Sequence, residues 1–223
     1  MAWAIVAIAV LGAGFAAVRW QGQHRPHPMP FWLEGFFLDN PLRRAWFRPD
    51  FVLQLAGPLE GRTVGEVGVG TGFVSAALAA AVGPQGRLQG IDQGSGSVAA
   101  AAARLGRLGL RGDLQCADAR SLPWADRSVD VVVMVAMLGE VAAASRPRVL
   151  DEVRRVLSPD GTLVVVEYWP DPHFLTPAAL RTQLASGGFR VKDARRRWLQ
   201  HGVRAYAAPE WVSASADGAD RCP

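Results

Sequence analysis

Three glycines at alternate positions follow a single carboxylate in the segment TVGEVGVGTGF. Glycine loses the most conformational freedom on folding, so the spacing of Gly68, Gly70 and Gly72 predicts a backbone that bends sharply and passes close to a ligand. A dinucleotide site would show G-x-G-x-x-G, but position 73 is Phe73. Glu66 would repel a pyrophosphate, and it suits a ligand with a cationic part.

Two further acids stand where the next two strands are expected to end. Asp92 closes LQGID, where a carboxylate can accept both hydroxyls of a ribose. Asp118 closes LQCAD, where a carboxylate can accept from an exocyclic amine. Acids at the ends of three consecutive strands suit a ligand that has an amino group, a ribose and an adenine but no phosphate. These features indicate S-adenosylmethionine as the cofactor.

Alternating strand-like and helix-like segments position these residues. The expected strands are 62–68, 87–91, 113–117, 129–136, 162–169, 189–198 and 202–208, and the expected helices are 73–82, 98–108, 148–157 and 177–186. The segment SPDG is expected to be a turn before strand 162–169. Repeated β-α-β units predict an α/β fold with a doubly wound, mostly parallel sheet of seven strands, which binds ligands at the carboxyl ends of its strands. The backbone N–H groups of Gly70 and Gly72 are expected to face the ligand there.

Residues 62–169 resemble the class I S-adenosylmethionine-dependent methyltransferases, which have a Rossmann-like fold. The family's motifs E-x-G-x-G-x-G, DA-x-x-LP, FDVV and E-x-x-RVL-x-P-x-G have counterparts in order at 66–72, 118–123, 129–132 and 152–161. The resemblance implies that Glu66 holds the methionine end, Asp92 the ribose and Asp118 the adenine amine. The implied cofactor-binding set is Glu66, Gly68, Gly70, Thr71, Gly72, Asp92, Gln93, Asp118 and Ala119.

Within this class, LPWADRSVD and EVRRVLSPDGTLVVVEY are most similar to the ubiquinone/menaquinone C-methyltransferase group and its lipid-modifying relatives. Two residues of the glycine turn depart from that group: Gly65 replaces a usual leucine, and Val69 replaces a usual proline. Neither change removes a ligand. The segment after Tyr206 matches the group poorly.

Methyl transfer from a sulfonium requires positioning of the acceptor, and it needs a general base only if the acceptor arrives protonated. Glu140 lies just beyond the fourth expected strand, 129–136, and Glu167 lies at the end of the fifth, 162–169. His173 follows in the loop after it and could serve as a base, although a loop histidine is more often a surface residue. We expect the catalytic candidates to be Glu140, Glu167 and His173.

A helical cap is expected to precede the cofactor domain and to contact the acceptor. Its segment DNPLRR also reads as an ordinary helix start, with Asp39 or Asn40 as the N-cap. Arg43 or Arg44 would contact an anionic head group, and nearby aromatic residues suit an apolar substrate. The expected substrate-binding residues are Asp39, Asn40, Arg43, Arg44 and Tyr168.

The N-terminal segment 1–18 carries no charged side chain and is just long enough to cross a bilayer, which takes about 17 to 25 residues. Arg19 and Arg25 follow it, which predicts a single-pass membrane anchor with the catalytic domain in the cytoplasm. A buried helix, or one lying on the membrane surface, is the alternative. The expected organisation is an anchor over 1–20, a linker and cap over 21–60, the cofactor domain over 61–210 and a disordered tail over 211–223.

The net charge of +4 comes without a basic stripe interleaved with aromatics, so nucleic-acid binding is not expected. Cys116 and Cys222 make no disulfide framework, and His24 and His27 lack partner acids, so no metal is assigned. Three functions remain open: methylation of a membrane-borne lipid or quinone, methylation of a soluble small molecule, and cofactor binding without catalysis. The acceptor atom and the oligomeric state stay open too.

Overall fold

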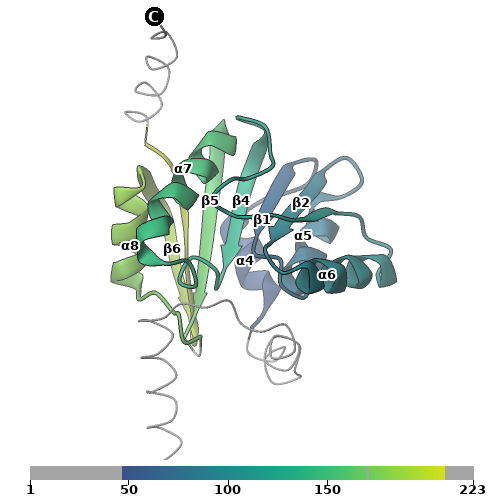
Figure 1. The fold of residues 1–223 in the computed structure, drawn as a ribbon, viewed down its shortest axis with the longest axis horizontal. Helices are drawn as coiled ribbons and strands as arrows, with labels where there is room; N and C mark the ends of the chain where they lie inside the picture. The colour runs from purple at the N-terminus through teal and green to yellow at the C-terminus, as the bar shows by residue number, and fades with distance from the viewer. Residues whose placement is uncertain (1–46, 170, 209–223) are drawn as a thin grey trace, which may run out of the picture.

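The computed structural model describes residues 47–169 and 171–208, and Figure 1 shows their arrangement. The helices are α4 (Pro49–Ala56), α5 (Phe73–Val82), α6 (Ser95–Arg107), the short 3₁₀ helix η1 (Ala143–Ser145), α7 (Arg146–Val156) and α8 (Pro177–Ser186). The strands are β1 (Thr63–Val67), β2 (Arg87–Asp92), β3 (Asp113–Cys116), β4 (Val129–Val135), β5 (Leu157–Tyr168), β6 (Phe189–Arg197) and β7 (Gln200–Ala207).

The seven strands form one sheet in the order β3-β2-β1-β4-β5-β7-β6. The first five of these strands are parallel, whereas β7 runs antiparallel to both β5 and β6. The strand order reverses between β1 and β4, which are neighbours in the sheet although two strands separate them in the chain. The predicted doubly wound, mostly parallel sheet is therefore confirmed, and its switch point lies where such folds bind ligands.

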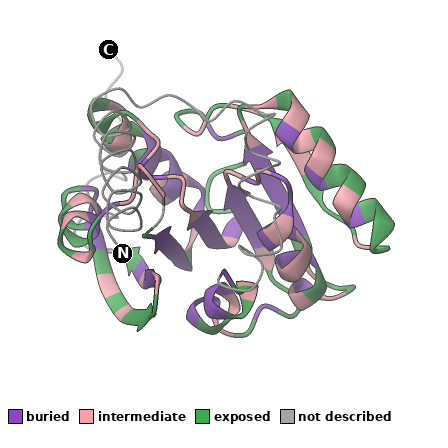
Figure 2. Ribbon diagram, turned by 90° about the horizontal axis from the view of Figure 1, so that it is seen from below, coloured by how far each residue is buried: buried purple, intermediate pink, exposed green. Residues whose placement is uncertain are grey.

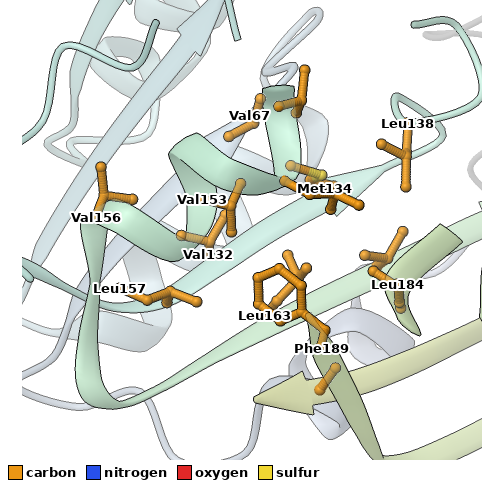
Figure 3. Packing of buried hydrophobic residues seen from close by; sticks show 14 of the residues in the cluster. Val67, Val132, Met134, Leu138, Val153, Val156, Leu157, Leu163, Leu184 and Phe189 are labelled. Carbon is orange, nitrogen blue, oxygen red and sulfur yellow. The ribbon is translucent and has the colours of Figure 1, made fainter. Parts of the chain in front are cut away.

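Helices cover both faces of the sheet, and the strands between them are buried (Figure 2). On one face α4 and α5 pack against the strands through apolar side chains such as Phe51, Leu55 and Leu78. On the other face α7 and α8 do so through residues such as Val153 and Leu184, which Figure 3 shows beside the strands. A strand covered on both faces needs an almost continuous apolar run, which explains the sequence VDVVVMV of β4.

The two segments 118–123 and 152–161, which carry motifs of the family resemblance, are hydrogen-bonded to each other. Glu152 of α7 accepts the backbone N–H of Leu122 at 2.9 Å, and Arg155 donates to the carbonyl oxygens of Leu122 and Trp124, both at 2.9 Å. Arg155 also pairs with Glu152 at 2.8 Å. The ion pair keeps the pKa of Glu152 below its usual range, so the carboxylate stays charged. These bonds fix the loop between β3 and β4.

That loop delivers Trp124 into the core against Gly65 of β1. A Cβ atom on Gly65 would lie 2.7 Å from Cζ3 of Trp124 and 3.2 Å from Cγ1 of Val129. Only glycine fits under the indole ring, which is 5% exposed. The departure from leucine at this position is therefore a packing adjustment.

The predicted helices over 73–82 and 177–186 are confirmed, and most other boundaries shift by one to three residues. The predicted SPDG turn before an independent strand is wrong. Leu157 already pairs with Val129, and Thr162 pairs with Val131, so residues 158–161 form an irregularity inside the single strand β5. Asp130 stabilises the irregularity by accepting the hydroxyl of Ser158 at 3.4 Å.

The predicted anchor over 1–18, the candidate substrate residues Asp39, Asn40, Arg43 and Arg44, and the tail over 211–223 lie outside the described residues. Among the helices of residues 47–208 that the structure describes, none is long and apolar enough to cross a membrane. The division of the chain into anchor, cap, cofactor domain and tail stays a prediction.

Candidate functional site

The glycine turn between β1 and α5 passes close to neighbouring atoms and uses left-handed backbone conformations. Gly68, Gly70 and Gly72 have φ angles of +86°, +48° and +78°, which favour glycine. A Cβ on Gly72 would lie 2.7 Å from Cα of Ala101, and one on Gly68 would lie 2.8 Å from Cγ of Met137. The spacing of the glycines thus reflects both conformation and close packing.

Asp92 at the end of β2 holds this turn in place. Its two carboxylate oxygens accept the backbone N–H groups of Gly70 and Gly94, each at 2.9 Å. The expectation that the N–H groups of Gly70 and Gly72 face the ligand is therefore wrong, because Gly72 N–H donates to the carbonyl of Val69 at 2.9 Å. A carboxylate has about four acceptor positions, so Asp92 keeps the capacity to accept ribose hydroxyls.

Glu66 of β1 is buried beneath the turn and only 2% exposed. Its Oε2 accepts the hydroxyl of Ser75, from α5, at 2.5 Å. Burial raises the pKa of Glu66 to about 8, because desolvation disfavours the charged carboxylate more than the Ser75 bond favours it, and nearby Asp92 adds repulsion. A cation reaching this carboxyl would favour its ionised form.

Two adjoining cavities open at the carboxyl ends of β1, β2 and β4. The larger has a volume of about 210 Å³, and the smaller about 100 Å³. Both are lined by Gly68, Asp92, Met137 and Glu140. Gln93, Asp118 and Ala119 line the larger cavity, and Glu66, Gly70, Thr71 and Asp171 line the smaller one. Of the nine predicted cofactor residues, only Gly72 lines neither cavity.

Asp118 reaches the larger cavity but already has a strong partner. Arg120 donates to both of its carboxylate oxygens, with a shortest distance of 2.6 Å, and the backbone N–H of Arg120 adds a bond of 2.8 Å. These bonds hold the pKa of Asp118 below its usual range. The carboxylate is thus ionised, and an amine would have to share it with Arg120.

Glu140, Asp171 and His173 converge from the segments after β4 and β5, and the first two of them line the smaller cavity. Their potential ligand atoms all lie within 4.8 Å of one another. His173 Nδ1 lies 3.5 Å from Oδ1 of Asp171, which also accepts the backbone N–H of His173 at 2.7 Å. A Cβ on Gly139 would collide with the carbonyl of His173, so glycine allows the two segments to meet. Such a group can accept a proton, and it is a donor set that could hold a cation although the sequence assigned no metal.

The candidates Glu167 and Tyr168 lie elsewhere. Glu167 is 1% exposed, lines neither cavity, and accepts the backbone N–H of Leu175 at 3.3 Å. Burial raises its pKa to about 8. Tyr168 is 9% exposed and also lines neither cavity; its ring lies edge-on to Phe47 at a centroid distance of 5.8 Å. Neither residue therefore reaches the two cavities, although Asp171 lies close enough to Glu167 for its charge to help raise the pKa of that carboxyl.

Several residues at the site were missed by sequence reasoning. Ser75, Arg120 and Met137 contact the predicted residues directly. Asp171 precedes His173 by two residues in the same loop, and this spacing could have indicated that the two side chains form a pair. No pattern in the sequence distinguishes Ser75 from its small neighbours in α5.

Comparison with known proteins agrees with this geometry. Residues 64–161 match the family described as a methyltransferase domain. The ubiquinone/menaquinone biosynthesis C-methyltransferase UbiE of Ectopseudomonas mendocina is 33% identical over 133 residues, which cover 59% of this chain and 50% of that protein. The demethylmenaquinone methyltransferase of Lactobacillus johnsonii is 36% identical over 100 residues, which cover 44% of this chain and 40% of that protein. The chain thus spans about half the length, or less, of these curated relatives.

Solved structures show the same fold. A SAM-dependent methyltransferase from Aquifex aeolicus is 26% identical, with a TM-score of 0.73, and the match covers 80% of this chain and 98% of that one. The [4+2]-cyclase SpnF is 29% identical with a TM-score of 0.58, and the match covers 66% of this chain and 57% of that one. Residues 64–161 therefore match a methyltransferase domain, and the chain is similar to class I, S-adenosylmethionine-dependent methyltransferases, among them the ubiquinone/menaquinone C-methyltransferases.

Proposed function

We propose that this protein transfers a methyl group from S-adenosylmethionine to a quinone-like or lipid acceptor held at a membrane. The observation that carries the proposal is the pair of adjoining cavities lined by Glu66, Asp92 and Asp118 at the ends of three parallel strands. The curated relatives named as quinone C-methyltransferases support a quinone ring as the acceptor.

The residues of the cavities fit the chemical groups of S-adenosylmethionine. Glu66 is a buried carboxyl whose pKa is raised to about 8, so it gains most from a cationic amino group beside it. Asp92 would hold the ribose and Asp118 the adenine amine. When bound, the cofactor supplies an electrophilic methyl group on a sulfonium. The chain's own task is to orient the acceptor in line with that methyl and to exclude water, and orientation can contribute about 7 to 11 kcal/mol.

The group of Glu140, Asp171 and His173 supplies the base in this proposal. Methylation of a ring carbon or a hydroxyl leaves a proton to be removed from the acceptor. His173 would accept it, and Asp171, at 3.5 Å from Nδ1, would stabilise the resulting imidazolium. Glu140 lines both cavities and would sit closest to the boundary between cofactor and acceptor. Glu167 has no role in this scheme because it is 1% exposed and its Oε2 already accepts the backbone N–H of Leu175.

Localisation belongs to the same proposal. An apolar segment over 1–18 would anchor the chain with its catalytic domain in the cytoplasm, where quinone-like lipids are accessible at the bilayer surface. Methylation of a soluble molecule, with that segment as a simple tether, is the alternative. Binding of the cofactor without methyl transfer is a second alternative.

The test is incubation of the full chain with isotope-labelled S-adenosylmethionine and either a membrane lipid extract or the soluble metabolites of the host. Mass spectrometry identifies the labelled product, and Asp92→Ala serves as the inactive control. Label in a quinone or lipid supports the proposal. Label only in a soluble metabolite supports the simple tether, and cofactor binding without label in either fraction contradicts methyl transfer.

A further inference from the structure

The turn that joins β6 to β7 presents a basic and aromatic surface to solvent. We call residues 195–199 the hairpin tip. Trp198 is 82% exposed, and its φ of +36° turns the chain at the end of the hairpin. Arg195, Arg196 and Arg197 precede it and are all exposed. An indole exposed to this extent keeps a large apolar surface in water, which is costly unless another surface covers it.

The hairpin tip lies at the same edge of the sheet as the cofactor cavities. Trp169, which is 49% exposed, donates its backbone N–H to the carbonyl of Leu199 at 2.8 Å. Gln200 pairs with Tyr168, the last residue of β5. Asp171, whose N–H donates to the carbonyl of Tyr168 at 2.9 Å, lines the smaller cavity. A continuous path of a few residues therefore connects the exposed indoles to the site.

The charge of the tip is only partly neutralised. Arg195 pairs with Asp193 at 2.9 Å. Arg196 and Arg197 form no ion pair with any carboxylate of the described residues. Two uncompensated guanidinium groups beside an exposed indole complement a surface that is anionic and has an apolar layer below it.

We propose that the hairpin tip, together with Trp169, docks on the surface of an anionic lipid bilayer. Tryptophan rings are favoured at the level of the lipid head groups, and arginine side chains pair with anionic head groups while their stems cover apolar surface. The docked tip turns the carboxyl edge of the sheet, and with it the cavities, toward the membrane. The inference deepens the proposed function and rests on it for the nature of the acceptor, but the docking itself rests on the exposed residues alone.

The experiment measures partition of the full chain between buffer and vesicles of phosphatidylcholine, with and without phosphatidylglycerol. Each basic residue near an anionic surface contributes about fivefold in partition. Arg196→Gln combined with Arg197→Gln should therefore lower binding to the anionic vesicles by about 25-fold and leave binding to pure phosphatidylcholine almost unchanged. Trp198→Ser should weaken binding to both kinds of vesicle several-fold.

A matched control lies at the opposite edge of the sheet. Leu108 is 59% exposed there, and the exposed Arg107 and Arg111 flank it. Arg107→Gln combined with Arg111→Gln removes the same charge and should not change the preference for anionic vesicles. Equal effects of the two double variants would show that net charge alone governs binding and would overturn the proposal.

Two further results decide the matter. If the wild-type chain binds both kinds of vesicle equally, and the tip variants behave like it, then another segment such as residues 1–46 accounts for any membrane binding and the tip does not dock. Calorimetric binding of S-adenosylmethionine should be the same in the wild-type chain and the tip variants. If the wild-type chain does not bind S-adenosylmethionine at all, the proposed function is refuted, but the result on membrane docking still stands.

Discussion

Cofactor binding is predicted to release a proton from Glu66. Burial raises the pKa of this carboxyl to about 8, so at pH 7 about nine molecules in ten carry the proton. A cationic amino group beside the carboxyl favours the ionised form and would bring its pKa well below 7. Binding at pH 7 should therefore release about 0.9 proton for each cofactor bound.

The same linkage fixes how affinity changes with pH. Release of nearly one proton means that the dissociation constant falls about tenfold between pH 6 and pH 7. Glu66→Gln keeps an oxygen to accept the Ser75 hydroxyl but cannot ionise. A hydrogen bond to a charged group contributes about 1.5 to 3 kcal/mol, and ionising Glu66 at pH 7 costs about 1.4 kcal/mol, so the variant should lose only about 1 kcal/mol at that pH.

Calorimetry in buffers with different ionisation enthalpies measures the number of protons released. The wild-type chain should give a slope of about one proton, and Glu66→Gln a slope near zero with an affinity that no longer varies between pH 6 and pH 7. Asp118→Asn is the matched control: the pKa of Asp118 already lies below its usual range, so this variant should bind more weakly yet release the same proton. Unchanged proton release in Glu66→Gln would refute the assignment of the amino group to Glu66.

Three further results are expected. Asp92→Ala should weaken S-adenosylmethionine binding by about 3 kcal/mol in calorimetry, because both the ribose and the N–H groups of the glycine turn lose a charged acceptor, and a loss below about tenfold would contradict that role. Gly70→Val should abolish binding, because a β-branched residue is strained at a φ of +48°, whereas Gly70→Ala should retain measurable affinity. Glu167 binds more protons in the folded than in the unfolded chain between the ordinary glutamate pKa of 4.5 and its folded pKa of about 8, so its contribution to stability is lost as pH rises through that window. Urea unfolding at a series of pH values should show this decline, amounting to as much as about 5 kcal/mol, and Glu167→Gln should reduce it, whereas an equal slope in the variant would rule out Glu167 as its source.

The elements that could be predicted from the sequence are those with strong local signals at their ends or along their length. Glycines follow α5 and α8, a proline opens α8, and the apolar run of β4 is typical of a parallel sheet. The acids at the ends of β1, β2 and β3 could be predicted as a group because parallel strands bring their carboxyl ends to one edge. The irregularity in β5 could not be predicted from the sequence. Residues 158–161 have a typical turn sequence, and only the pairing of Leu157 and Thr162 with β4 shows that they lie inside one strand.

The sequence also could not predict which face of the sheet a side chain on a buried strand points to. Val164, Val165 and Val166 are all buried, so the apolar pattern before Glu167 does not indicate which face of the sheet that residue joins. The convergence of His173 and Asp171 with Glu140 depends on contact between two loops that are far apart in the sequence. Gly139 permits that contact, but its role is visible only once the partner loop is placed.

The indole of Trp124 over Gly65 makes two positions behave as one mutational unit. Restoring leucine at position 65 alone would drive its side chain into a ring whose atoms already lie 2.7 Å from the Cβ position. Shortening Trp124 alone would instead leave a void beneath the switch point of the sheet, at a cost of about 3 to 5 kcal/mol. Each single change is therefore harmful, while the double change can be nearly neutral. The stability effects of substitutions at positions 65 and 124 are therefore expected to be strongly non-additive, because each side chain fixes the space that is left for the other.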